Sequence, residues 1–252
     1  MIYVTGDCHG DWRRFSSKSF PQQSEMTRED FVIVCGDFGI WHDSPAERYW
    51  LDWLSNKNFT LCFVDGNHEN FDRLNGEEFE EVFFHGGKAH KIRDNIYHLK
   101  RGYIFTLCGK NIFTFGGAHS HDISDGVLDG KDFASTYDFM HEIKKWQSQN
   151  KMFRVNHVSW WQEEVPSREE MSLGIDNLKD INNKVDFIIT HTCPNEILSQ
   201  AFPTYCPDDI GRYLDYIYNN VRFEHWYCGH YHEDVTDDIE FSFLYRQIVK
   251  AI

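Results

Sequence analysis

Residues 2–10 read Ile2-Tyr3-Val4-Thr5-Gly6-Asp7-Cys8-His9-Gly10. The first four form a β-branched and aromatic run, which is typical of a short strand, and Gly6 predicts a sharp turn directly after it. Asp7 and His9 follow at a spacing of two, at which side chains point to the same side of an extended chain. We therefore expect both to reach one point beyond the strand, with Cys8 turned away into the packing.

The same arrangement of an apolar run, a glycine and a polar side chain recurs along the chain. Phe31–Cys35 precedes Gly36-Asp37, and Thr60–Val64 precedes Gly66-Asn67. Asp7, Asp37 and Asn67 are thirty residues apart, which fits the length of a strand–helix–strand unit. The apolar runs Val185–Thr190 and His225–Cys228 lead to three histidines, which are His191, His230 and His232.

The side chains that follow these runs are of types that bind divalent cations. There are seven of them: Asp7, His9, Asp37, Asn67, His191, His230 and His232. Carboxylate, amide and imidazole ligands without thiolates favour Mn²⁺, Fe or Zn²⁺ over Ca²⁺. Such a set can hold two adjacent cations, and a shared carboxylate between them lowers the pKa of a bridging water toward neutrality. The pattern therefore points to attack on a phosphorus–oxygen ester bond.

The order Asp-x-His, Gly-Asp, Gly-Asn-His-Glu, His and Gly-His-x-His resembles the calcineurin-like metallophosphoesterases, and the match runs from Asp7 to His232. The resemblance implies an α/β fold, namely a two-sheet β-sandwich flanked by helices in αββα order. It implies that one ion is bound by Asp7, His9 and His232, and that the other is bound by Asn67, His191 and His230. It also implies that Asp37 bridges the two ions, and that His68 lies beside the scissile group.

The residues around the second aspartate separate two branches of this superfamily. Ser/Thr protein phosphatases carry Gly-Asp-x-x-Asp-Arg-Gly, whereas this chain reads Gly36-Asp37-Phe38-Gly39-Ile40-Trp41-His42 and lacks the arginine that would grip a phosphoprotein phosphate. Residues 116–122 (Gly-Gly-Ala-His-Ser-His-Asp) and 160–164 (Trp-Trp-Gln-Glu-Glu) resemble a bacterial and phage-associated branch of uncharacterised members. We therefore expect that branch.

Four further side chains are candidates for the substrate pocket, namely Trp41, Asn70, His119 and His121. A tryptophan at 41, 160 or 161 can stack on a nucleobase, or it can pack in the core or at its rim. The two histidines can touch substrate or belong to a surface loop. Glu69 can orient His68 or a ligand, or it can be exposed.

The ligand-type residues come from both ends of the chain, so we expect one domain over residues 1–252, with about 120–180 as an inserted helical decoration or lid. Pro45–Asn56 predicts a helix capped by Ser44, with Tyr49, Trp50, Trp53 and Leu54 on one face. Residues 90–118 predict an antiparallel meander of short strands. Further helices are expected at Asp132–Lys145, from Pro166 and at Asp208–Asn219, and Phe241–Val249 is expected to close the sheet.

Composition and charge narrow the partners and the location. The chain has 252 residues and a net charge of −15, so its surface repels duplex nucleic acid and favours small phosphorylated molecules or nucleotides. Its seven cysteines are odd in number and lie mostly in apolar runs, which favours free thiols in a reducing compartment. Because we find no signal peptide and no membrane-spanning run, we expect a cytoplasmic protein that does not bind a membrane.

Together these features predict dinuclear metal-dependent hydrolysis of phosphate esters by a metal-bridging hydroxide. Mn²⁺ is the expected metal, with Fe or Zn²⁺ as alternatives, and His68 would protonate the leaving oxygen or stabilise its charge. The sequence leaves phosphomonoesters and phosphodiesters both open. A nuclease or cyclic phosphodiesterase acting on short RNA or single strands is an alternative. A non-catalytic scaffold is a further one, although scaffolds are expected to have lost ligands that this chain keeps.

Overall fold

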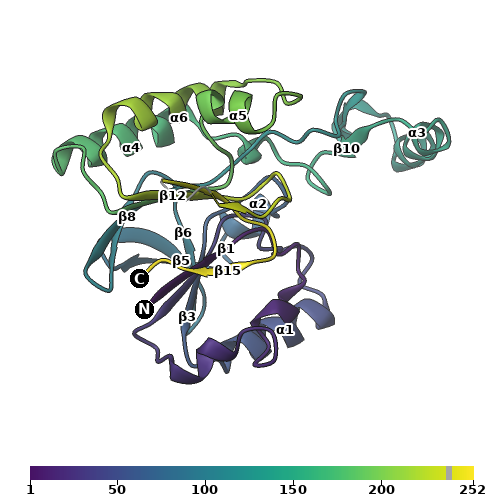
Figure 1. Ribbon diagram of the computed structural model, residues 1–252. Helices are drawn as coiled ribbons and strands as arrows, with labels where there is room; N and C mark the ends of the chain where they lie inside the picture. The colour runs from purple at the N-terminus through teal and green to yellow at the C-terminus, as the bar shows by residue number, and fades with distance from the viewer. Residues whose placement is uncertain (237–239) are drawn as a thin grey trace.

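Two mixed β-sheets packed face to face form the centre of the computed structural model, which describes residues 1–236 and 240–252 (Figure 1). The first sheet has seven strands in the order β15-β1-β2-β3-β6-β5-β4, and the second has six in the order β13-β14-β12-β11-β8-β7. A separate two-stranded sheet, β10-β9, belongs to an arm that leaves the sandwich.

The strands of the first sheet are β1 (Ile2–Thr5), β2 (Phe31–Val34), β3 (Thr60–Phe63), β4 (Glu80–Phe84), β5 (Gly87–Arg93), β6 (Ile96–Leu99) and β15 (Ile248–Lys250). Those of the second sheet are β7 (Ile104–Leu107), β8 (Lys110–Phe115), β11 (Phe187–Thr190), β12 (His225–Cys228), β13 (Val235–Thr236) and β14 (Phe241–Phe243). The small sheet consists of β9 (Gly126–Leu128) and β10 (Phe153–Val155).

The α-helices are α1 (Pro45–Ser55), α2 (Phe71–Leu74), α3 (Thr136–Ser148), α4 (Arg168–Asp180), α5 (Asn195–Ala201) and α6 (Asp209–Asn220). Short 3₁₀ helices are η1 (Trp12–Phe15), η2 (Pro21–Glu25), η3 (Gly130–Asp132) and η4 (Gln162–Glu164).

Strand β2 shows why the central strands read as continuous apolar runs. Phe31, Ile33 and Cys35 face the second sheet, while Val32 and Val34 face the outer helical layer. Both faces are buried, so the usual alternation of apolar and polar residues is lost. The parallel neighbours β1, β2 and β3 are all of this kind.

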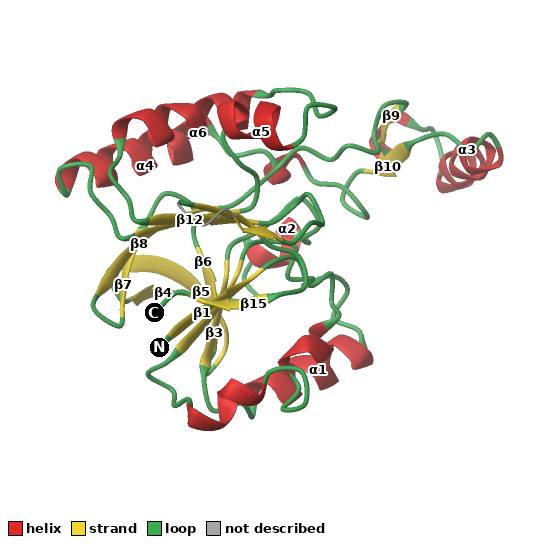
Figure 2. Ribbon diagram, viewed as in Figure 1, coloured by secondary structure: helices red, strands yellow, loops and turns green. Residues whose placement is uncertain are grey.

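Helices cover the outer face of each sheet, which completes four layers (Figure 2). Leu51 and Leu54 of α1 pack on the first sheet. Leu178 of α4, Leu198 of α5 and Leu214 of α6 pack on the second. The predicted αββα sandwich is therefore confirmed.

The meander predicted for residues 90–118 is wrong. The segment forms two hairpins in different sheets, because β5 pairs with β6 in the first sheet and β7 pairs with β8 in the second. The chain crosses between the sheets near Arg101 and Gly102, where the backbone N–H of Gly102 donates to the carbonyl of Thr114. Sequence separation alone does not say whether consecutive strands pair with each other.

Phe241–Val249 was expected to be one closing strand, and this is also wrong. The structure divides it into β14 of the second sheet and β15 of the first, with a turn between them. The turn is held by Asp234, whose carboxylate accepts from the backbone N–H groups of Tyr245, Arg246 and Gln247. The final residues therefore join the two sheets.

Helix α1 begins as predicted, with Ser44 as its cap, but its buried face is different. The face runs through Glu47, Leu51 and Leu54, and the Tyr49 ring is 63% exposed. The expectation for Tyr49 is wrong because aromatic content alone defined the predicted face, whereas burial follows the i, i+4, i+7 positions.

Residues 120–160 form the arm on the right of Figures 1 and 2, with β9, α3 and β10. Helix α3 has no buried residue, and its packing is local, with Trp146 against Phe153. By contrast, α4 begins with a complete capping box, Ser167 to Glu170, and lies on the second sheet. None of the helices in the described ranges is long and apolar enough to cross a membrane.

Candidate metal centre

The ligand-type side chains meet at one edge of the sandwich. Asp7, Asp37 and Asn67 follow the parallel strands β1, β2 and β3, so the first sheet brings them to the same edge. His191 follows β11, and His230 and His232 follow β12 in the second sheet. The site thus lies where the carboxyl ends of strands from both sheets converge.

One cluster joins the first loop to the last histidine. The Oδ2 atom of Asp7 lies 3.2 Å from Nε2 of His232 and 3.7 Å from Nε2 of His9. The two imidazole Nε2 atoms are 2.9 Å apart. These three side chains offer ligand atoms that all lie within 4.8 Å of one another, which suits a single cation.

Asp37 reaches from this cluster to a second one. Its Oδ2 lies 3.7 Å from Nε2 of His9, while its Oδ1 lies 3.5 Å from Nε2 of His191. Asp7, Asp37 and His191 also offer ligand atoms within 4.8 Å of one another. The Asp37 carboxylate therefore presents one oxygen to each cluster, which is the geometry that a bridging ligand needs.

The contacts of His191 test whether a cation fits here. Its Nδ1 lies 2.7 Å from the carbonyl oxygen of Cys35, which can only accept, so Nδ1 carries the proton. In the neutral ring Nε2 then presents a lone pair, and it faces Oδ1 of Asn67 at 3.2 Å and Oδ1 of Asp37 at 3.5 Å. Three acceptors that converge without a proton between them favour a cation in their midst.

The protonation of the other histidines agrees with cation binding. Burial lowers the pKa of His9 to about 4, and it lowers the pKa of His230 well below the usual value. Both rings are therefore neutral near neutral pH, as metal ligands must be. The hydrogen bond to Asp7 raises the pKa of His232 instead, so this pair shares a proton whose place a cation can take.

Four of the predicted ligands have left-handed backbone conformations, with φ of +48° at His9, +46° at Asp37, +72° at His230 and +54° at His232. Such conformations are uncommon outside glycine and persist where the surrounding structure holds them. Glycine is needed beside them. A Cβ on Gly66 would lie 2.0 Å from Oδ1 of Asp37, so only glycine lets the two loops approach this closely.

A cavity of about 190 Å³ opens beside the clusters, and it is lined by Asp37, Asn67, His68, His121, Asp122, Tyr205, His230, Tyr231 and His232. The backbone N–H of His68 donates to Oδ1 of Asp37 at 2.8 Å, which holds the loop in place. The His68 ring lies 5.3 Å from the His9 ring and 5.8 Å from the Trp41 ring, centroid to centroid. His68 thus faces the same space as the clusters without joining them.

The chain matches the sequence model of one protein family. The family model of the calcineurin-like phosphoesterases matches residues 1–234, which include all of these side chains. The chain belongs to this family. Members typically bind two metal ions, and the two Asp/His clusters are the candidate positions for them in this chain. Among curated proteins, no match was found.

The residues predicted for the substrate pocket make the following contacts. His230 faces His121, with their Nε2 atoms 2.7 Å apart, and His119 bonds Asp209 at 2.7 Å. Asn70 caps α2 by accepting from Arg73 N, and it donates to the Trp41 carbonyl. Its side chain is thereby engaged in holding the loop that carries Trp41.

The sequence left two roles open for Glu69, which were the orientation of His68 or a ligand and exposure at the surface. Glu69 is fully buried, so the exposed alternative is wrong. Its carboxylate accepts from the backbone N–H groups of Phe38, Gly39 and Ile40 at 2.6–3.2 Å. Burial raises its pKa well above the usual value, against these hydrogen bonds. Glu69 therefore holds the loop directly after Asp37, which is a candidate ligand.

Two further sets of contacts support the candidate ligands. Glu164 accepts from Ser120 through the backbone N–H at 2.8 Å and the hydroxyl at 2.7 Å. Ser120 Oγ in turn accepts from Nδ2 of Asn67 at 3.3 Å, which leaves Oδ1 of Asn67 turned toward His191. On the opposite side, Arg14 donates to the carbonyl oxygens of Gly6 and Asp7.

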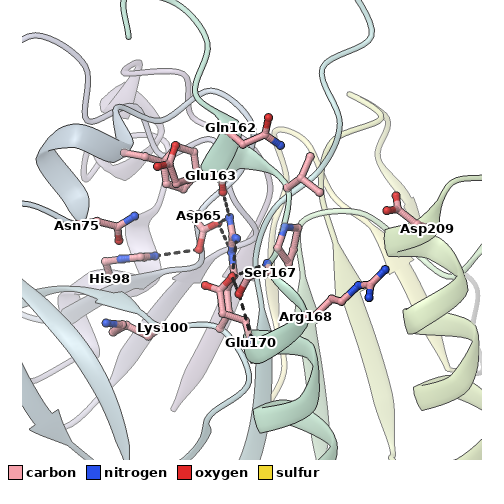
Figure 3. Close-up of a pocket in the computed structure, with 14 residues that line it drawn as sticks. Asp65, Asn75, His98, Lys100, Gln162, Glu163, Ser167, Arg168, Glu170 and Asp209 are labelled. Carbon is pink, nitrogen blue, oxygen red and sulfur yellow. Dashed lines mark hydrogen bonds and ion pairs between the residues drawn. The ribbon is translucent and has the colours of Figure 1, made fainter. Parts of the chain in front are cut away.

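Asp65, two residues before Asn67 in the chain, forms a buried ion pair with Arg101, and Figure 3 shows His98 beside Asp65. Nε of Arg101 donates to Oδ2 of Asp65 at 2.8 Å, and His98 Nε2 lies 3.0 Å from the other carboxylate oxygen. Arg101 also donates to the carbonyl of Glu163 at 2.8 Å and contacts Glu170 at 3.3 Å. Arg101 thus ties the strand end that leads to Asn67 to the segment that carries Glu164.

Replacing Arg101 with methionine is expected to destabilise the fold by about 3–5 kcal/mol near neutral pH, because it leaves the Asp65 carboxylate buried without its partner. Burial opposes ionisation of Asp65, but the interactions with Arg101 and His98 together outweigh it, so the Asp65 pKa is lowered. A lowered pKa contributes stability above the unfolded-state value and loses it as the pH falls. Urea unfolding should therefore show a deficit that is complete above about pH 4 and shrinks as the pH falls below this value. A deficit independent of pH would contradict this account.

Proposed function

We propose that this chain is a dinuclear metal-dependent phosphoesterase. The observation that carries the proposal is Asp37, which offers one carboxylate oxygen to His9 at 3.7 Å and the other to His191 at 3.5 Å. Two divalent cations bound on either side of it would supply Lewis acidity and a water activated near neutral pH. The ligand types support Mn²⁺ as the first choice, with Fe or Zn²⁺ as alternatives.

The residues of the chain have separate tasks in this proposal. Asp7, His9 and His232 hold one ion, Asn67, His191 and His230 hold the other, and Asp37 belongs to both. The cavity beside them receives the phosphate, and His68 faces the leaving oxygen from its wall. Because burial lowers the pKa of His68, its neutral ring is suited to donate a hydrogen bond that stabilises the developing charge.

The size of the cavity supports small substrates. Its volume of about 190 Å³ is below the 300–1,000 Å³ usual for pockets that enclose a ligand. A phosphate group therefore enters, while the rest of the substrate stays at the rim. With the net charge of −15, this favours small phosphorylated molecules or nucleotides over duplex nucleic acid.

The segment from Gly116 to Asp122 supports the bacterial and phage-associated branch of the family. Its Ser120 contacts Asn67, and its His121 contacts His230, so the segment lies against the candidate ligands. The Asp-Arg pair of the protein phosphatase branch has no counterpart after Asp37. All seven cysteines lie in the described part of the chain and are free, which supports a reducing compartment such as the cytoplasm.

One observation favours a second candidate, a nuclease or cyclic phosphodiesterase acting on short single strands. The Trp41 ring lies beside the His68 ring at the edge of the site, where a base can stack. Trp161 is unsuited to this role, because it is 1% exposed and donates to Asp72. Cleavage of short RNA that is insensitive to salt would favour this candidate, since stacking, unlike phosphate contacts, does not release counterions.

Hydrolysis of a set of esters in the presence of Mn²⁺ tests the proposal. The set comprises p-nitrophenyl phosphate, its bis ester, cyclic nucleotides and 2′,3′-cyclic phosphates. We expect turnover of at least one of them and its loss on chelation, because in this proposal the bound cations activate the attacking water. No turnover with Mn²⁺, Fe²⁺ or Zn²⁺ on any of these esters would contradict the small-substrate proposal.

A further inference from the structure

An arginine from the arm lies beside the candidate site. Arg154 of β10 binds Asp122, with Nε 2.9 Å and 3.0 Å from the two carboxylate oxygens and Nη2 2.6 Å from Oδ2. Asp122 lines the same cavity as His68 and His230. The guanidinium is therefore one side chain away from the space in which a phosphate would sit.

The arm is fixed to the site loop and does not merely pass it. Nδ1 of His157 lies 2.9 Å from the carboxylate of Asp72, and Nε1 of Trp161 donates to the same carboxylate at 2.8 Å. Asp72 belongs to α2, which begins three residues after His68. Figure 2 shows β10 leading from the arm back toward the sandwich. The contacts to α2 thus set Arg154 beside the loop that carries His68.

The guanidinium of Arg154 keeps donors that Asp122 does not occupy. The Arg154 side chain is 20% exposed. The Nε and Nη2 atoms of Arg154 both contact the Asp122 carboxylate. Within residues 1–236 and 240–252, no hydrogen-bond partner contacts Nη1. A guanidinium has five N–H donors, so it can bind an anion through Nη1 while Asp122 holds its other edge.

We propose that Arg154 binds the phosphoryl group of the substrate and gives the site a preference for phosphomonoesters. This rests on the proposed phosphoesterase function and deepens it. Protein phosphatases carry a phosphate-binding arginine after the second aspartate, and this chain lacks it after Asp37. In the proposal Arg154 binds the phosphate instead, from a different part of the chain. Asp122 orients the guanidinium.

The charge of the substrate explains the preference. A phosphomonoester carries about −1.5 to −2 charges near neutral pH, whereas a diester carries a single one. An additional fixed positive charge, with a fork that matches phosphate oxygens, therefore stabilises a bound monoester more than a diester. The positive charge of Arg154 also stabilises bound inorganic phosphate. Because inorganic phosphate has no leaving group, its affinity reports on binding alone.

Two variants test this, Arg154→Gln and Arg154→Lys. With Mn²⁺, Arg154→Gln is expected to raise the KM for p-nitrophenyl phosphate and the inhibition constant of inorganic phosphate by about 10- to 100-fold, and the KM for the bis ester by less. Arg154→Lys keeps the charge without the fork, so it should recover part of the loss. Arg93→Gln is the matched control, because Arg93 is also partly exposed and pairs with Asp52 at 3.1 Å.

Monoester and phosphate constants that match those of Arg93→Gln would overturn the proposal. Equal losses on both esters together with a lowered Tm would overturn it as well, since they indicate a structural role for the pair with Asp122. Calorimetric titration with inorganic phosphate separates this inference from the function itself. If the unaltered protein hydrolyses neither ester but Arg154→Gln still loses phosphate affinity, the Arg154 contact stands and the catalytic proposal fails.

Discussion

Replacing His68 with asparagine is expected to lower turnover by about 10²–10⁴-fold while the bound metal content stays unchanged. The side chain lines the cavity, so its loss removes a hydrogen-bond donor to the leaving oxygen. The metal should stay, because the link to Asp37 is made by the backbone N–H of His68 at 2.8 Å and not by its ring. Steady-state kinetics and metal analysis of the same preparation measure both quantities.

His141→Asn provides the matched control for this result. His141 is exposed on α3 in the arm, and its ring stacks on Tyr137, away from the clusters. Its replacement should leave turnover unchanged. If His68→Asn matched this control, His68 would have no part in the chemistry. If His68→Asn lost bound metal, the role of His68 would be to position the metal ligands and not to contact the substrate.

Replacing Asp37 with asparagine is expected to lower turnover by about 10³-fold or more, together with loss of at least one metal ion. Asparagine keeps an oxygen that can accept from His68 N but offers no second anionic oxygen, so the two clusters are no longer joined. Asp52→Asn is the control, because Asp52 is 68% exposed and pairs with Arg93. Retention of the full metal content in Asp37→Asn would contradict the bridging role.

Thermal unfolding tests the Asp37→Asn variant by a measurement that does not depend on activity. Burial raises the pKa of Asp37, and the negative charge of Asp7 adds to this, so ionised Asp37 destabilises the metal-free fold near neutral pH. The metal-free Asp37→Asn protein should therefore melt no lower than the unaltered metal-free protein. Added Mn²⁺ should raise the Tm of the unaltered protein much more than that of the variant, because binding to the native state stabilises it.

The central strands could be predicted from the sequence because their residues are buried on both faces. Ile2–Thr5 and His225–Cys228 have the expected bounds, and Gly6 and Gly229 directly after them mark their ends. The pairing of the hairpins could not be predicted, since β6 finds its parallel neighbour in β3, more than thirty residues earlier. Local pattern carries no information on such partners.

In the candidate site, some ligands could be predicted from the sequence, whereas the contacts that support them could not. Asp7 and His9 share a two-residue spacing, and the structure brings them to one cluster with His232. The supports of the site depend on tertiary contacts. Glu69 reaches the loop after Asp37 across thirty residues, and Arg154 approaches His68 only because the arm folds back onto Asp72. Glu69 belongs to the Gly-Asn-His-Glu motif, but the motif does not say which loop its carboxylate holds, and Arg154 has no spacing or motif that distinguishes it from a surface charge.

Anomalous diffraction from crystals soaked in Mn²⁺ tests the central proposal most directly. We expect two manganese peaks about 3.5–4 Å apart, with the Asp37 carboxylate between them. One peak should lie among Asp7, His9 and His232, and the other beside Asn67, His191 and His230. A single peak, or none at full metal saturation, would contradict the dinuclear site and with it the proposed hydrolysis.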